Sequence, residues 1–138
     1  MFFSGFNTIL MRLMGVDYGN KKIGIALSDE KGEFSFPYAV LENKSGIFGK
    51  IRKICRGSNI EKIILGMPLD FKNQPTDATA GAQEFKSRLE KEIGLSVVFE
   101  DERFSTKEAE RIQGRTDKID ASAAALILKS YISRNDML

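Results

Sequence analysis

Apolar residues recur in short runs near the start of the chain and at helical spacing further on. Residues 12–17, 23–28 and 34–41 are short β-prone runs, separated by the turn-rich segments GNKK and DEKGE. This pattern predicts three consecutive strands in an antiparallel meander. Residues 1–10 precede the first regular pattern, and we interpret them as an N-terminal extension, either disordered or the result of an upstream start codon.

The hydrophobic period changes to that of a helix after residue 45. A predicted helix ends near residue 57, and its apolar face carries Ile47, Ile51, Ile54 and Cys55. Residues 62–65 are then a short β-branched run followed at once by Gly66 and Pro68, which predicts a buried strand.

The second half of the chain alternates helix and strand. After Pro75 the apolar spacing predicts an amphipathic helix that begins at Thr76 or Asp77 and stops at Gly94. A strand over residues 95–100 follows, then a short helix from a capping box at Ser105 to about residue 112. The last helix is expected to start near residue 120, with an inward stripe of Ala121, Ala124, Ala125, Leu128, Tyr131 and Ile132.

This order of elements predicts an α/β fold with a mixed sheet flanked by helices. The 138 residues fit one domain, which we assign to residues 11–138. A hydrophobic content of 42% and a charged content of 29% are typical of globular proteins and exclude the disordered and fibrous classes. No apolar run is long enough for a membrane helix, and the single cysteine excludes an internal disulfide, so we expect a cytoplasmic protein.

The chain has no histidine, which limits its chemistry more than any other feature of composition. The usual general base, histidine-containing catalytic triads and nearly all zinc sites are excluded. The net charge of +2 is too small to indicate a nucleic-acid partner by itself, although residues 44–56 carry five cations and no acid. Any catalysis must use carboxylates, lysines, hydroxyls or a metal ion.

Acidic residues stand at three element ends. Asp17 ends the first strand, Glu100, Asp101 and Glu102 follow the last strand, and Asp120 starts the final helix. Alone, each is more often a turn residue, a solvated corner or a helix cap. Because ligands gather at the carboxyl ends of parallel strands, the combination predicts a shared site for Mg²⁺ or Mn²⁺ that could hydrolyse a phosphodiester.

Several other residues could bind phosphates near these acids. Gly19 could let the backbone approach a phosphate, Lys21 or Lys22 could contact one, and Arg103 could hold one or neutralise Asp101. A hairpin turn also favours glycine, and lysines are commonly exposed. The long loop over residues 69–79 is a candidate substrate-binding element. A cationic helix face could add affinity or simply be solvated; it consists of Lys50, Arg52, Lys53 and Arg56.

Four sequence blocks, MGVDYGNKKIGIAL, IILGMPLD, EDERFSTKEAE and KIDASAAALIL, resemble the YqgF/RuvX family of bacterial ribonuclease-H-like nucleases. The resemblance spans residues 11–134 and implies a ribonuclease-H-like, mixed five-stranded sheet, with three antiparallel strands followed by two parallel ones. It also implies a metal-dependent endonuclease using Mg²⁺ or Mn²⁺, with a role in maturing the 5′ end of precursor 16S rRNA and with the ribosomal particle as a possible partner.

The resemblance assigns the family's acidic positions to Asp17, Asp101, Glu102 and Asp120. We expect Asp17, Glu102 and Asp120 to be the metal ligands, with Glu102 preferred slightly over Asp101. Related resolvases of this fold carry a glutamate at the end of the fourth strand, where this chain has Gly66 and Met67. Two alternatives stay open: resolution of branched DNA, for which a dimer is typical, and RNA binding in ribosome assembly without catalysis.

Overall fold

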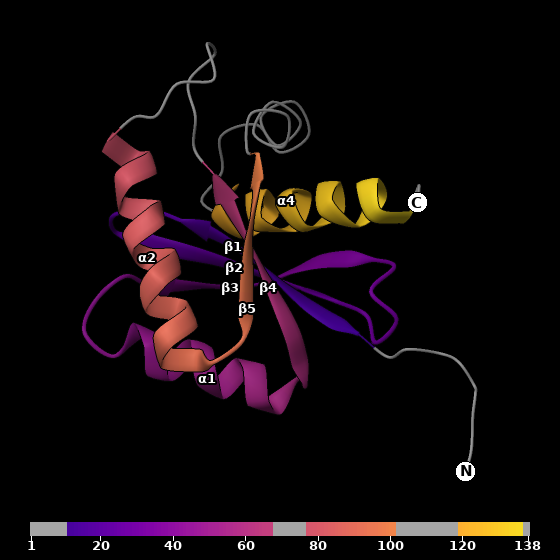
Figure 1. The fold of residues 1–138 in the computed structure, drawn as a ribbon, viewed down its shortest axis with the longest axis horizontal. Coiled ribbons are helices and arrows are strands. Elements are labelled where there is room, and N and C mark those ends of the chain that lie inside the picture. The colour runs from indigo at the N-terminus through magenta and orange to yellow at the C-terminus, as the bar shows by residue number, and fades with distance from the viewer. Residues whose placement is uncertain (1–10, 68–76, 102–118, 137–138) are drawn as a thin grey trace.

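The computed structural model describes residues 11–67, 77–101 and 119–136. Within these ranges, five strands form one sheet and three helices pack against it (Figure 1). The strands are β1 (Arg12–Tyr18), β2 (Lys22–Ser28), β3 (Ser35–Glu42), β4 (Ile60–Met67) and β5 (Ser96–Asp101). The helices are α1 (Ile47–Gly57), α2 (Asp77–Ile93) and α4 (Ile119–Asp136).

The strands are arranged in the order β3-β2-β1-β4-β5. The pairs β1–β2 and β2–β3 are antiparallel, as short hairpin connections require. The pairs β1–β4 and β4–β5 are parallel, and helices α1 and α2 supply the crossovers that parallel strands need. The predicted mixed sheet, three antiparallel strands followed by two parallel ones, is therefore confirmed.

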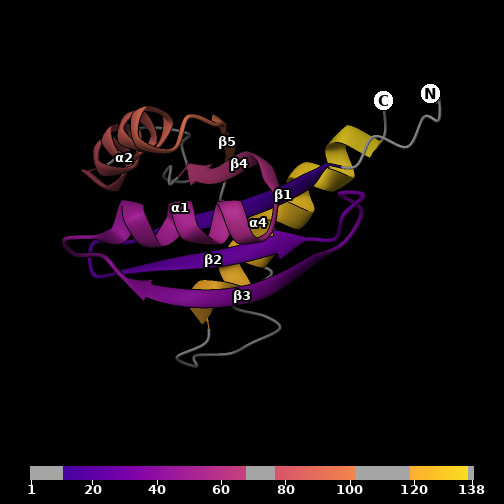
Figure 2. The same ribbon diagram turned by 90° about the horizontal axis from the view of Figure 1, so that it is seen from below.

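Helices cover the two faces of the sheet unequally, with α1 and α2 on one face and α4 on the other (Figure 2). Side-chain alternation along β1 supplies both layers of the core. Met14 and Val16 join the cluster beneath α1 and α2, whereas Leu13 joins the cluster beneath α4. Each layer is closed by a different part of the chain, and the carboxyl ends of the strands lie between the two layers.

The observed element bounds differ from the predicted ones in informative places. Strand β4 extends beyond the predicted residues 62–65, because it pairs with a neighbour on each side. Helix α1 begins only after Gly46, whose φ of 92° places it outside the helix. Helix α2 begins at Asp77, so the last part of the expected loop over residues 69–79 is helical. The predicted extension over residues 1–10 and the predicted helix over residues 105–112 lie outside the described residues.

Helix α4 packs unusually close to β1. A β-carbon built on Gly15 would lie 2.7 Å from the carbonyl oxygen of Ala124 and 2.8 Å from the β-carbon of Leu128. The buried face of α4 also includes Ile127, which the predicted stripe lacked, while Ala125 and Tyr131 are only half-buried. The position of α4 on the sheet therefore depends on the missing side chain at residue 15.

Helix α1 buries its apolar face as predicted, with Ile47, Ile51 and Cys55 in the core. On its opposite face, Arg52 donates to the backbone carbonyl of Glu92 at 2.7 Å, so one of the four expected cations joins α1 to the end of α2. None of the helices in the described ranges is long and apolar enough to cross a membrane.

We expect the substitution Gly15→Ala to destabilise the protein by about 1–3 kcal/mol, because the new methyl group forces α4 away from the sheet. Urea unfolding followed by circular dichroism measures the change. Gly49→Ala is the control: it lies within α1 with open space around it, and alanine there should raise stability by up to about 1 kcal/mol. Equal stability of Gly15→Ala and the unmodified protein would contradict the close packing.

The thiol of Cys55 should be nearly unreactive in the folded protein. Burial raises the pKa of this thiol to about 11, from an ordinary value of 9.0. At pH 8 roughly one thiol in a thousand is then ionised, against roughly one in ten after unfolding, and the thiolate is the reactive form. We expect alkylation by iodoacetamide to be about 100-fold slower in buffer than in 8 M urea, as followed by mass spectrometry. Similar rates in both solutions would show that this part of the core is open.

Candidate active site

The carboxyl ends of three parallel strands meet at one edge of the sheet. The register pairs Val16 with Leu65 between β1 and β4, and Met67 with Asp101 between β4 and β5. Asp17 is the second-last residue of β1, and Asp101 is the last residue of β5. One strand separates them, so their backbones are about 10 Å apart. This edge is where ligands bind in open α/β sheets.

Side-chain alternation places Asp17 on the face covered by α4. Gly15 faces Ala124 and Leu128 of that helix, and Asp17 is two residues further along the same strand. The side chain of Asp17 is half-buried. Tyr18, the next residue, points to the other face, where its ring packs against Phe85 of α2. The side chains of the last two residues of β1 thus point to opposite faces of the sheet.

Asp120 is the second residue of α4 and precedes Ala124 by one helical turn. One turn advances a helix by about 5.4 Å, and residues four apart lie on the same side of a helix. Since Ala124 contacts Gly15, the backbone at Asp120 belongs to the same side of the same helix. The structure therefore brings the start of α4 to the face that carries Asp17. The side chain of Asp120 lies outside the described residues.

Glu100, expected as the last residue of the strand over residues 95–100, lies inside β5. Its side chain is only 3% exposed, on the α4 face of the sheet. The carboxylate accepts a hydrogen bond of 2.7 Å from the hydroxyl of Ser130 and another from the guanidinium of Arg134. Sequence reasoning placed Glu100 outside the family's acidic positions, and these contacts give it a structural role. It fastens α4 to β5.

Of the next two acidic residues, Asp101 is the last residue of β5 and Glu102 follows the strand. Asp101 is half-buried, and regular alternation places its side chain on the face opposite to Glu100. It is therefore also opposite to Asp17. Glu102 and Arg103 lie outside the described residues.

The turn between β1 and β2 leaves no room for a side chain at residue 19, which explains the glycine there. A β-carbon on Gly19 would lie 2.6 Å from the carbonyl oxygen of Lys22. The side-chain amide of Asn43 donates to the carbonyl of Gly19 at 2.9 Å, and its backbone N–H donates to Lys21 at 2.8 Å. These bonds hold the turn in place. Lys21 and Lys22 are exposed there, at the same edge as Asp17.

The described part of the chain contains no group of three or more acidic or cysteine side chains that could hold a metal ion. Of the three predicted ligands, Asp17 alone has a described side chain. Its carboxylate oxygens are the donor type that Mg²⁺ and Mn²⁺ prefer. The donor chemistry thus fits such an ion, with the remaining ligands to come from segments whose side chains are not described.

Comparison with known proteins gives one consistent family. The profile of the RuvX family, described as Holliday junction resolvase, matches residues 11–134. The chain belongs to this family. A relative from Syntrophus aciditrophicus is 38% identical over 137 residues and covers 88% of each chain. One from Sulfurihydrogenibium sp. is 32% identical over 133 residues, covering 91% of this chain and 92% of its own. Both are named "Putative pre-16S rRNA nuclease".

Solved structures show the same fold at low sequence identity. Thermus thermophilus RuvC in complex with a Holliday junction substrate has a TM-score of 0.57 at 15% identity, covering 91% of this chain and 96% of that one. A Fowlpox virus resolvase with Holliday junction DNA has a TM-score of 0.51 at 16% identity, covering 91% and 99%. The predicted ribonuclease-H-like fold and the resemblance to the RuvX nucleases are therefore confirmed.

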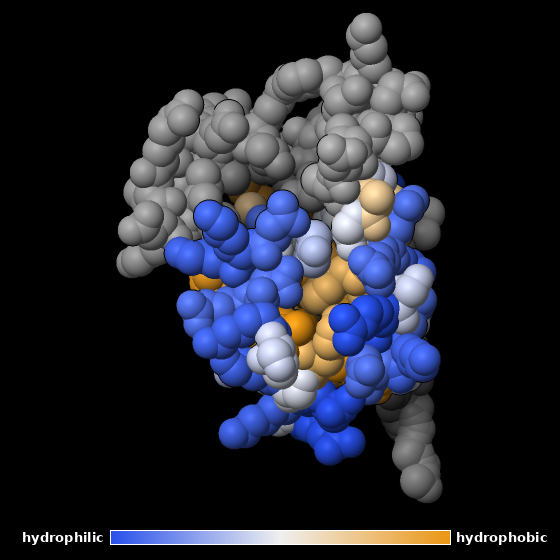
Figure 3. Space-filling view, turned by 90° about the vertical axis from the view of Figure 1, so that its left-hand side faces the viewer, coloured by the Kyte–Doolittle hydropathy of each residue, from blue (hydrophilic) through white to orange (hydrophobic). Residues whose placement is uncertain are grey.

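This RuvX-family chain also has a cavity that sequence reasoning missed. It lies on the α1 and α2 face of the edge, next to Tyr18, and has a volume of about 320 Å³. Figure 3 shows apolar side chains in a hollow bordered by hydrophilic ones on this side of the molecule. Phe85 lies on the buried apolar face of α2, but no periodicity could show that it meets Tyr18 and Phe48 from two other elements.

Removing the guanidinium of Arg134 should test the attachment of α4 to β5. We expect Arg134→Leu to destabilise this RuvX-family protein by about 1–3 kcal/mol, because the buried carboxylate of Glu100 loses its charged partner. Urea unfolding gives the value. The control, Arg52→Leu, removes an ion pair with Glu92 at 3.4 Å and a hydrogen bond to the backbone carbonyl of Glu92, both near the surface, and should cost less than Arg134→Leu because no buried charge loses its partner. A larger effect of Arg52→Leu would contradict this assignment.

Proposed function

We propose that this protein is a metal-dependent endonuclease that hydrolyses phosphodiester bonds in structured RNA, and that it processes the 5′ end of precursor 16S rRNA in the cytoplasm. The observation that supports this most strongly is the placement of Asp17. It stands at the carboxyl end of β1, on the face where α4 begins with Asp120. Family membership and the names of the relatives point to the same class of reaction.

The proposed ligands are Asp17, Glu102 and Asp120, holding Mg²⁺ or Mn²⁺. Such an ion would act as a Lewis acid, neutralise the charge of the carboxylates and help to activate water for attack on phosphorus. Glu102 is preferred over Asp101, because regular alternation in β5 turns Asp101 away from Asp17. Asp101 would then act beside the ligands rather than among them.

The remaining candidates would bind the substrate backbone. Lys21 and Lys22 are exposed on the turn that follows Asp17, where their ammonium groups can meet phosphates on either side of the scissile bond. Gly19 keeps this turn tight, which holds both lysines near the edge. Arg103 would contribute a bidentate phosphate contact from the segment that follows β5.

A second candidate function, resolution of branched DNA, is favoured by the description of the family and by the RuvC-like fold. RNA is placed first because the relatives that share about a third of this sequence along nearly its whole length are named for pre-16S rRNA. A third candidate is an RNA-binding assembly factor that has the same fold but neither cuts RNA nor needs a metal ion. The three candidates differ in substrate, cleavage and metal dependence.

We expect the purified protein to cut a precursor 16S rRNA leader with Mg²⁺ or Mn²⁺, and Asp17→Asn to slow cutting by roughly 100-fold or more. Gel analysis of end-labelled RNA measures the rate. The matched control is Asp29→Asn, in the β2–β3 turn: an amide oxygen there can still accept from the backbone N–H groups of Glu33 and Phe34, so cutting should continue.

Each alternative gives a different pattern in the same assay. Symmetric cutting of four-way DNA junctions with no cutting of RNA would replace the RNA assignment by the resolvase. Salt-sensitive RNA binding without cutting in either metal would favour the assembly factor. Full activity of Asp17→Asn would remove the proposed site.

A further inference from the structure

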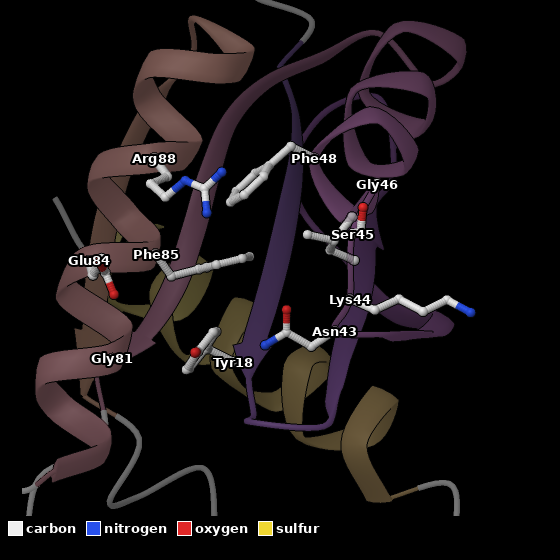
Figure 4. A pocket seen from close by; sticks show the side chains of 11 residues that line it. Tyr18, Asn43, Lys44, Ser45, Gly46, Phe48, Gly81, Glu84, Phe85 and Arg88 are labelled. Carbon is white, nitrogen blue, oxygen red and sulfur yellow. The ribbon is translucent and has the colours of Figure 1, made fainter.

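The cavity beside Tyr18 is built by three separate parts of the fold. Tyr18 comes from the end of β1, Phe85 and Arg88 come from α2, and Phe48 comes from the first turn of α1. Asn43 and Ser45 border it from the segment between β3 and α1 (Figure 4). Its volume of about 320 Å³ is at the small end of the range for ligand sites, which suits one aromatic group rather than a duplex or a folded peptide.

Three aromatic rings line the interior. The ring centroids of Tyr18 and Phe85 are 4.8 Å apart, and those of Phe48 and Phe85 are 5.3 Å apart. Phe85 is almost fully buried between the other two, which are half-buried and offer ring surface to the cavity. Flat apolar surfaces of this kind bind nucleobases by stacking, whatever the base.

Two polar side chains, Arg88 and Asn43, favour one orientation of a group bound in the cavity. The guanidinium carbon of Arg88 lies 4.5 Å from the centroid of the Phe48 ring, so its positive charge is held at the cavity wall. The amide nitrogen of Asn43 is occupied by its bond to Gly19, which turns the amide oxygen into the cavity as an acceptor (Figure 4). A cation with an acceptor below it matches a nucleotide, whose base carries N–H donors and whose phosphate is negative.

Two other charged residues, Glu84 and Lys44, border the cavity. The side chain of Lys44 extends away from it (Figure 4), and its ammonium pairs with Glu42 at 2.9 Å. Of the two cations that line the cavity, Arg88 is therefore the one held against the aromatic rings.

The cavity lies one residue from the proposed catalytic carboxylate. Asp17 and Tyr18 are consecutive, so their α-carbons are about 3.8 Å apart, but their side chains serve opposite faces of the sheet. A nucleic-acid strand that places a phosphate at Asp17 and continues round the end of β1 passes the mouth of the cavity within a few nucleotides. We propose that the cavity binds one unpaired nucleobase of the substrate strand, close to the bond that is cut.

This inference rests on the proposed function, because it assumes a strand at Asp17. It adds a requirement on the substrate: at least one nucleotide near the cut must be unpaired so that its base can leave the helix and stack. A fully paired duplex would leave the cavity empty. Specificity for structure, rather than for sequence, follows from stacking that every base can make.

The test compares single-base removal in the RNA with closure of the cavity in the protein. A fluorescein-labelled precursor 16S leader is prepared with an abasic ribose at each position in turn, and its affinity is measured in EDTA so that no strand is cut. We expect one position, near the cut site, at which loss of the base weakens binding by about tenfold. Ser45→Trp, at the exposed border of the cavity, should fill the cavity and weaken binding of the intact RNA by a similar factor.

The two changes should not add, since both remove the same contact. In Ser45→Trp, the abasic position should lose its effect to within about twofold. The matched control is Ser87→Trp, on the exposed surface of α2 and outside the cavity lining, which should behave as the unmodified protein does. Circular dichroism of both variants verifies that they are folded.

Three outcomes would overturn the inference. In the first, no abasic position changes the affinity for the RNA. In the second, the sensitive abasic position weakens binding to Ser45→Trp as much as to the unmodified protein, which would show that the base binds elsewhere. In the third, free adenosine or uridine monophosphate binds in a manner that Ser45→Trp abolishes while no abasic position matters, which would assign the cavity to a free nucleotide. Since binding is measured without cleavage, a protein that shows the base dependence but never cuts refutes the proposed function and leaves the binding of one base in the cavity standing.

Discussion

The contact between α4 and Gly15 is the constraint on which the rest of the arrangement depends. Without a side chain at residue 15, the carbonyl of Ala124 and the β-carbon of Leu128 occupy the space that a β-carbon would fill. The helix then crosses the sheet and forms hydrogen bonds with β3 and β5. Ser35 of β3 donates to the carbonyl of Ala125, and Ser130 and Arg134 donate to the carboxylate of Glu100 in β5. Apolar contact fixes how near the helix lies, and these hydrogen bonds fix where along each strand it lies.

A consequence of this packing is that one sheet edge is used on both faces. On the α4 face, β1 presents Asp17 beside the start of a helix whose depth is fixed at Gly15. On the other face, β1 presents Tyr18 to α2, and Gly81 allows that approach, since a β-carbon there would be 3.2 Å from the Tyr18 ring. The proposed catalytic carboxylate and the proposed base-binding cavity are therefore adjacent along the backbone but separated by the sheet, and a flexible strand could engage both.

Sequence reasoning recovered the elements of the described ranges and their order because each depends on local periodicity. The runs around Val16, Ile25 and Leu65 are buried as their patterns predicted, and α2 stops at Gly94, whose φ is 81°. Contacts between distant elements were not predictable in this way. Nothing local to Glu100 shows that Arg134 will meet it, and the three rings of the cavity come from three different elements, β1, α1 and α2. The face of a residue at a strand end depends on how far the strand stays regular, which is why Asp101 and Glu102 could not be separated from sequence.

Glu100 shows how the chain keeps an acid near the candidate site without adding to the site's charge. The register that pairs Val16 with Leu65 and Gly66 with Glu100 places Asp17, Gly66 and Glu100 in one row across the α4 face. Gly66 contributes no side chain to this row. Arg134 and Ser130 satisfy the carboxylate of Glu100 from α4, so it is already engaged and a metal ion would have to displace both partners. In the proposed site the other ligands, Glu102 and Asp120, belong to the segment after β5 and to the start of α4, so the position of that helix would matter to the chemistry as much as the acids themselves.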